Sequence, residues 1–183
     1  MNWIRDTSRI VVASAKMVIM KVKFLIEKDP VGIEKGARPM STNLPKYDHI
    51  ADNYDVLDYI IPHAWRRQAT SFASGRVLEV GVGTGLNLPF YPSCCQEVVG
   101  IDISEHMLAQ ARKKALQAKF PVTLEVMNVQ AMDLDGQSFD CVIATFVFCS
   151  VSDPVAGLRE CHRLLKPGGR LILLEHMASP TFG

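Results

Sequence analysis

A glycine-rich stretch over residues 76–87, with the sequence RVLEVGVGTGLN, constrains the fold of this chain more than any other part of it. It begins with three apolar residues that predict a strand: Val77, Leu78 and Val80. Three glycines follow at alternate positions: Gly81, Gly83 and Gly85. Such a turn lets a ligand approach the backbone, and a helix starting near Thr84 would direct free N–H groups at it. The stretch therefore predicts the opening of a nucleotide-binding α/β unit.

The spacing of the glycines favours a ligand without a phosphate. Dinucleotide-binding turns follow G-x-G-x-x-G, because the pyrophosphate rests on the helix N-terminus. Here the third glycine comes one residue earlier, and the acidic Glu79 stands two residues before the first. A carboxylate at this position suits a cationic ligand such as S-adenosylmethionine (SAM), which carries a sulfonium and an ammonium group. A nicotinamide-dependent oxidoreductase and a purely structural turn are the alternatives.

A second acidic residue supports nucleotide binding. Residues 97–101 form another apolar run, and Asp102 ends it, about 20 residues after the glycine turn. An acid at the tip of the second strand can accept hydrogen bonds from ribose hydroxyls. The alternative is that Asp102 only caps the next helix, a role that Ser104 could fill instead.

Four blocks of sequence resemble the class I SAM-dependent methyltransferases. They are 78–85 (LEVGVGTG), 99–108 (VGIDISEHML), 138–151 (SFDCVIATFVFCSV) and 164–171 (LLKPGGRL). Within that class the chain looks most like the phospholipid N-methyltransferases, and it is similar to the membrane-associated thiol and the quinone methyltransferases of the type 11 domain group. The resemblance implies a Rossmann-like α/β fold, with a mostly parallel sheet and helices on both faces. It also implies SAM as the cofactor and S-adenosylhomocysteine as the product.

The resemblance assigns parts of SAM to the ends of the expected strands. The glycine turn would hold the methionine part, Asp102 the ribose and residues 128–130 the adenine edge. Asn128 stands where the family often has an acid, and its amide can still accept from the adenine amino group. The expected cofactor residues are Glu79, Gly81, Gly83, Thr84, Gly85, Asn87, Asp102, Ile103, Met107, Asn128, Val129, Gln130 and Thr145.

Three further residues are candidates for catalysis. Tyr47 and Tyr54 lie in residues 47–60, which resemble the family's element that closes over SAM, and their rings could stabilise a cation. His176 follows the expected fifth strand and could accept a proton from an acceptor amine or thiol. Packing tyrosines and a structural histidine are the alternatives. No metal site is expected, because the five cysteines lack C-x-x-C spacing.

Composition narrows the range of partners. The chain has 183 residues, 48% of them hydrophobic and 21% charged, with a net charge of +1. This balance is ordinary for one globular domain and lacks the basic excess of nucleic-acid-binding proteins. We therefore expect a small, lipophilic methyl acceptor, such as a phosphatidylethanolamine-type amine, a quinone or a thiol, and no nucleic acid.

Residues 1–28 are expected to form an amphipathic helical arm. They are rich in apolar residues and carry basic residues at helical spacing, but no apolar run reaches the ~20 residues that span a bilayer. Such an arm suits a membrane surface and a peripheral position on its cytoplasmic side. An organellar targeting segment, or packing on the core or on a second subunit of a homo-oligomer, are the alternatives. Residues 29–43 have the composition of a linker, and residues 44–183 would form the SAM-binding core.

The expected core ends soon after its fifth strand. The family's usual fold continues with two more strands and a helix, so the sheet is expected to be C-terminally truncated. Its edge would then be covered by the N-terminal arm or completed by a partner, because an uncovered edge strand invites association. A SAM-binding protein without turnover, or a fragment that needs a partner, is therefore the alternative to an enzyme.

Overall fold

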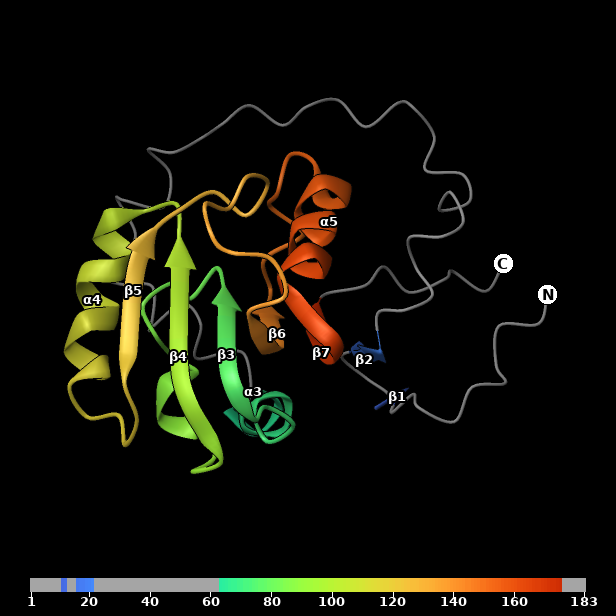
Figure 1. The fold of residues 1–183 in the computed structure, drawn as a ribbon. Coiled ribbons are helices and arrows are strands. Elements are labelled where there is room, and N and C mark those ends of the chain that lie inside the picture. The colour runs from blue at the N-terminus through green and yellow to red at the C-terminus, as the bar shows by residue number, and fades with distance from the viewer. Residues whose placement is uncertain (1–10, 13–15, 22–62, 176–183) are drawn as a thin grey trace, which may run out of the picture.

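A sheet of seven strands, in the order β1-β2-β7-β6-β3-β4-β5, forms the centre of the molecule (Figure 1). The computed structural model describes residues 11–12, 16–21 and 63–175. Five neighbouring strands run parallel: β3 (Gly75–Val80), β4 (Cys95–Asp102), β5 (Val122–Val126), β6 (Phe139–Thr145) and β7 (Leu165–Glu175). The Rossmann-like α/β fold with a mostly parallel sheet is confirmed.

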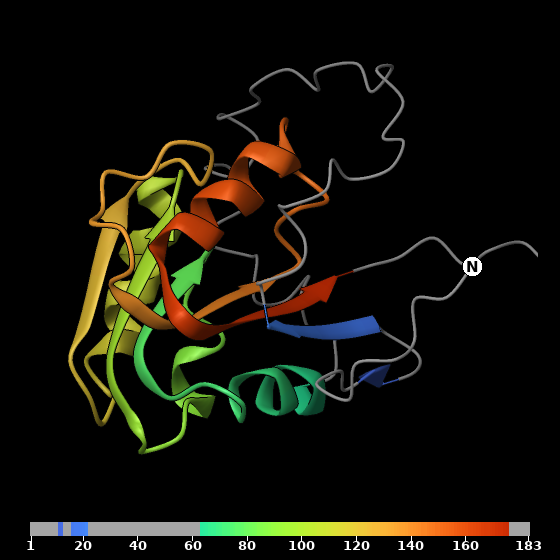
Figure 2. The same cartoon turned by 45° about the vertical axis from the view of Figure 1, so that its right-hand side comes forward.

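Helices cover both faces of this sheet (Figure 2). On one face lie α3 (His63–Thr70), the short 3-10 helix η3 (Leu88–Phe90) and α4 (Glu105–Ala115), and on the other lies α5 (Pro154–Leu164). Local signals start α4 and α5: the side chains of Ser104 and Asp153 accept hydrogen bonds from the backbone N–H groups of Met107 and Ala156. The start of α4 agrees with the expectation that Ser104 could cap this helix.

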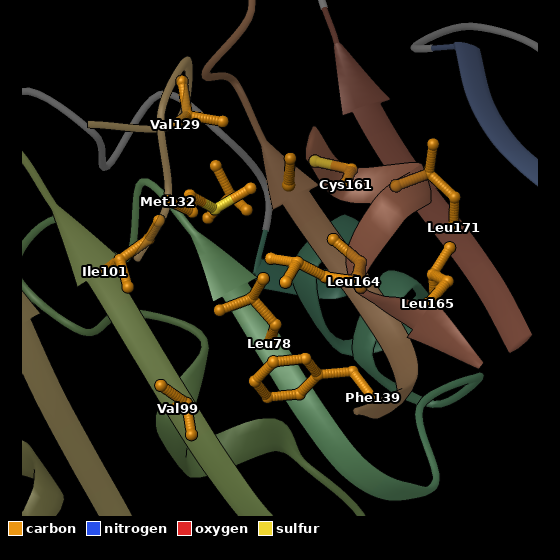
Figure 3. Packing of buried hydrophobic residues seen from close by; sticks show 13 residues of the cluster. Leu78, Val99, Ile101, Val129, Met132, Phe139, Cys161, Leu164, Leu165 and Leu171 are labelled. Carbon is orange, nitrogen blue, oxygen red and sulfur yellow. The ribbon is translucent and has the colours of Figure 1, made fainter. Parts of the chain in front are cut away.

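The central strands are buried on both faces, which explains why they are continuous apolar runs in the sequence. In β3, Leu78 belongs to the cluster under α5, and its neighbour Val77 to the cluster under α3. Figure 3 shows the α5-side cluster, in which Leu164 and Cys161 of the helix lie over Leu78 of β3 and Phe139 of β6. These two layers fix the carboxyl ends of the strands relative to one another.

The α-helix expected to start near Thr84 and run to Pro92 is wrong. Turns follow β3 instead, and only η3 is helical in this stretch. Gly85 has φ +81°, outside the right-handed helical region, and Pro89 lacks the N–H that an α-helix would need after its first turn. The ligand-facing backbone in this stretch is therefore a glycine turn and not a helix N-terminus.

The helical arm expected over residues 1–28 is wrong for residues 11–12 and 16–21. These form β1 (Val11–Val12) and β2 (Lys16–Lys21), and β2 pairs antiparallel with β7, with Ile19 opposite Ile172. The edge of β7 offers a row of backbone groups that β2 satisfies. Within the described residues β7 is the last parallel strand, and β2 and β1 extend the sheet beyond it. The expected boundaries at residues 28 and 43 lie outside the described residues.

Among the residues that the structure describes, no helix is long and apolar enough to cross a membrane.

Removing residues 1–21 should expose the edge of β7. Without β2, the β7 amides that do not bond to β6 lose their acceptors, so they should exchange roughly fivefold faster, the effect of losing about 1 kcal/mol of hydrogen bonding. Hydrogen exchange followed by mass spectrometry measures this, and β4, on the far side of β3, serves as the internal control. Equal protection of β7 in both chains would contradict the pairing with β2.

Candidate functional site

The order of the strands places a ligand site at the carboxyl ends of β3, β4 and β6. From β3 the chain proceeds to β4 and β5 on one side of the sheet, and later returns to place β6 on the other side of β3. Open α/β sheets bind ligands at such a reversal, outside the carboxyl ends of the strands. The glycine turn, Asp102 and the loop after Thr145 all lie at this edge.

The three glycines of the turn have positive φ and three different surroundings. A Cβ at Gly81 would lie 2.5 Å from a methyl group of Val147, and one at Gly85 would lie 3.1 Å from the Cα of Ala111 in α4. A Cβ at Gly83, where φ is +55°, would meet nothing within 4 Å. The outer glycines let the turn pack tightly, and the middle one leaves its backbone open to a ligand.

Asp102 connects the turn to the next helix. Its Oδ2 accepts from the Gly83 N–H at 2.9 Å, and its Oδ1 accepts from the Ser104 N–H at 2.9 Å. Ser104, not Asp102, caps α4. The carboxylate is half-buried, and beside it Ile103 is 41% exposed. Met107 is buried in the core behind them.

A lysine of α4 also supports the turn. The ammonium group of Lys114 donates to the carbonyl oxygen of Thr84 at 2.8 Å, and the Thr84 side chain is buried. The turn is therefore held on both sides of Gly83.

A buried polar network lies beneath the turn. Glu79, 1% exposed, accepts from the Asn87 amide at 2.8 Å and from the Tyr91 hydroxyl at 2.9 Å. The guanidinium of Arg66 donates to the Asn87 amide oxygen at 3.2 Å and to the Thr145 hydroxyl at 3.1 Å. The Asn87 amide also donates to Thr145 at 3.0 Å. These five residues form the Glu79 network.

Sequence reasoning identified only part of this network. From the sequence alone, Arg66 and its neighbour Arg67 are expected to be solvated or to meet lipid phosphate. In the structure Arg67 is exposed, but Arg66 is buried. The helical spacing of Arg66 from Ala69 and Thr70, both buried, was the available signal, because residues three and four apart share a helix face. Tyr91 was also missed.

Burial raises the pKa of Glu79 from 4.5 to about 7. The hydrogen bonds from Tyr91 and Asn87 and the charge of Arg66 oppose this rise, and the charge of Asp102 adds to it. Burial, then the charge of Glu79, raises the pKa of Tyr91 well above 10, so its hydroxyl stays a donor. Near neutral pH the protonation of Glu79 is therefore sensitive to any charge that arrives above it.

The loop after β6 borders the turn on its other side. Phe146 has φ +59°, a left-handed conformation that is strained for a bulky residue, and the guanidinium carbon of Arg66 lies 5.5 Å from the centre of its ring. The Glu175 carboxylate holds the loop by accepting from the N–H groups of Val147 and Phe148, both at 3.0 Å. This places apolar side chains next to Gly81.

The three residues expected at the adenine edge have three different environments. Asn128 is exposed, and its Oδ1 accepts from the Gln130 N–H at 2.9 Å. Val129 is buried against Gly157 of α5. The Gln130 side chain joins this loop to the start of α5 by accepting from the Ser152 hydroxyl at 2.7 Å. Asn128 alone presents an exposed side chain.

The three catalytic candidates, Tyr47, Tyr54 and His176, lie outside the described residues, so their roles stay predictions. Within the part of the chain that the structure describes, no group of three His, Cys, Asp or Glu residues could hold a metal ion, and the five cysteines are free.

The raised pKa of Glu79 should make stability depend on pH. Between pH 4.5 and about 7 the folded protein binds more protons than the unfolded chain, so the free energy of unfolding should fall as the pH rises, by up to about 3 kcal/mol. Urea unfolding across this range measures the slope. Glu79→Gln should remove most of it, because the amide does not titrate, and an unchanged slope in that variant would contradict the assignment.

The chain matches proteins of known family over most of this site. Residues 78–173 match the family described as "Methyltransferase domain". The chain is 35% identical over 161 residues to the ubiquinone/menaquinone biosynthesis C-methyltransferase UbiE of Syntrophotalea carbinolica, which is 81% of this chain and 67% of that one. It is 42% identical over 106 residues to the phosphatidylethanolamine N-methyltransferase of Cereibacter sphaeroides, covering 57% of this chain and 52% of that one.

The fold has solved counterparts. A SAM-dependent methyltransferase from Thermotoga maritima superposes with a TM-score of 0.56 at 29% identity, over 69% of this chain and 58% of that one. The chain thus spans about half to two thirds of the length of the proteins that it matches. The matched residues carry the glycine turn, Asp102 and the loops after β5 and β6, and the chain therefore belongs to the methyltransferase domain family.

Proposed function

We propose that the chain transfers a methyl group from SAM to a small, lipophilic acceptor. The observation that carries the proposal is the glycine turn, in which Gly83 faces open space between its hydrogen bond to Asp102 and the Glu79 network below. A turn without a side chain at its middle, beside two carboxylates, suits a ligand that is a nucleoside at one end and a cation at the other.

The residues at the edge of the sheet fit the parts of SAM. A carboxylate has about four acceptor positions, so half-buried Asp102 can take ribose hydroxyls in addition to its backbone bonds. The exposed Ile103 offers an apolar surface to the adenine ring, and the exposed Asn128 amide can meet its edge. Glu79 supplies negative charge beneath the turn, where the methionine part would lie.

SAM, when bound, supplies a methyl group on a sulfonium, which is a good leaving group. The chain then has to hold the acceptor in line with that methyl group and to exclude water. Phe146, Val147 and Phe148 are half-buried, and Val147 lies against Gly81 of the turn, so this loop can contribute an apolar wall. His176 remains our candidate for taking the proton that an amine or thiol acceptor loses.

The acceptor class rests on the relatives and on charge. The names of two relatives place one in quinone biosynthesis and assign the other to phosphatidylethanolamine, both lipophilic molecules. The net charge of +1 offers no general attraction for nucleic acid. A lipophilic acceptor favours a peripheral position at the cytoplasmic side of a membrane. That position does not depend on an arm helix, since residues 16–21 pair with β7.

Gly83→Val should reduce SAM affinity at least tenfold, because the new side chain would occupy the open space beside the turn. Gly168→Val is the matched control. Gly168 also has positive φ, at +80°, and an open Cβ position. It lies near the amino end of β7, whereas the site lies at the carboxyl ends of the strands. Isothermal titration calorimetry with SAM should show a loss in the first variant only. Equal affinities in both would contradict a cofactor site at Gly83.

Incubation with SAM should methylate one of three lipophilic acceptors: phosphatidylethanolamine in vesicles, a demethylated quinone or an alkyl thiol. Mass spectrometry of the extracted acceptors detects the added methyl group, and Gly83→Val should lower its yield. RNA and DNA serve as negative controls, because the chain lacks a basic excess. Methylation of nucleic acid without any of the three would overturn the acceptor class, and SAM binding with no product would favour a binding protein.

A further inference from the structure

We propose that Arg66 is a positioning residue of the cofactor site, which keeps Glu79 anionic beneath the turn when the cationic cofactor binds. The inference rests on the proposed function, because it names a role for a buried side chain toward SAM. Arg66 belongs to α3, which precedes the residues of the family match.

The guanidinium of Arg66 lies inside the site and does not point into solvent. It is 5% exposed, and it bonds to Asn87 and Thr145, the two side chains that also bond to each other. Asn87 in turn donates to Glu79. Arg66 and Glu79 therefore bond to the same side-chain amide, that of Asn87: the guanidinium donates to its oxygen, and its nitrogen donates to the carboxylate.

Burial of a guanidinium and a carboxylate is costly unless the charges compensate each other. Several of the described groups act on the charge of Glu79. The hydrogen bonds of Tyr91 and Asn87 favour the anion, and so does the charge of Arg66 in α3. The charge of Asp102 in β4 opposes it. Arg66 is the cation among these groups, so its removal should favour the protonated acid.

A positive charge above the turn would shift the same balance. SAM attracts the anion and gains nothing comparable from a neutral carboxylic acid, so its affinity should rise with pH until Glu79 is ionised in the free protein, at about pH 7. Loss of the Arg66 charge should move that rise to higher pH. A purely structural arginine would lower stability without moving it.

Calorimetric titration of the full chain with SAM between pH 5.5 and 8.5 tests this role. Arg66→Lys keeps the charge, and Arg66→Met keeps most of the apolar stem without it. In Arg66→Met we expect the midpoint of the rise to move to a higher pH than in the wild type. A shift of about one pKa unit from about 7 would lower the SAM affinity at pH 7 about fivefold, because the ionised fraction of Glu79 falls by that factor. Arg66→Lys should keep the wild-type midpoint.

Glu79→Gln supplies the baseline. The amino group of SAM itself titrates near pH 8, and this contribution is present in every variant, so the pH dependence left in Glu79→Gln measures it alone. Tyr91→Phe removes a hydrogen bond that favours the anion without touching α3, and it should move the midpoint upward as Arg66→Met does. Should Arg66→Met not fold, Arg66→Gln removes the same charge and keeps an amide that can donate to Asn87 and Thr145.

A second readout needs no cofactor. In urea unfolding, the pH range over which stability falls should extend further upward in Arg66→Met than in the wild type. An unchanged midpoint for SAM and an unchanged range for unfolding in Arg66→Met and Tyr91→Phe would overturn the inference and leave the proposed function standing. Failure of the wild-type chain to bind SAM would overturn both.

Discussion

The hydrogen bonds to the buried carboxylate of Glu79 are the interaction on which the rest of the site depends. A carboxylate at the end of a central strand is unstable without donors, because an unpaired charge in the interior costs several kcal/mol. Asn87 and Tyr91 supply those donors from the segment after the turn. Their bonds close the chain from residue 79 to residue 91 into a loop over the end of β3. Through Thr145 and Arg66, the same network reaches β6 and α3.

The turn above this carboxylate is held before any ligand arrives. Asp102 accepts from the Gly83 N–H, Lys114 donates to the Thr84 carbonyl oxygen, and Val147 packs against Gly81. These contacts come from β4, α4 and the loop after β6, so the backbone around Gly83 is fixed from three directions. A binding surface that is already ordered loses less conformational entropy on binding. The open position at Gly83 is thus a rigid one.

Local signals carried most of what the sequence predicted correctly. Apolar runs located β3 and β4, and the cap at Ser104 located the start of α4. The errors involve contacts between distant residues or backbone conformation. Arg66 is buried because of Thr145, 79 residues away, and β2 is a strand because β7 offers an edge. The left-handed φ of Gly85 prevents the α-helix that was expected after β3, and the pattern of apolar residues does not indicate such a φ.

The cofactor side of the site and the loop after β6 are held by different contacts, and this difference bears on the choice of acceptor. The cofactor side combines the Glu79 network with the bonds of Asp102 and Lys114. Loss of any one of these contacts would disturb the others. The loop at Phe146–Phe148 is held by Glu175 and by the bond from the Phe146 N–H to the Leu174 carbonyl oxygen, and it contains a strained φ at Phe146. Loops on a rigid scaffold can vary without disturbing it. One cofactor turn can therefore serve relatives whose names specify acceptors as different as a quinone and a phospholipid amine.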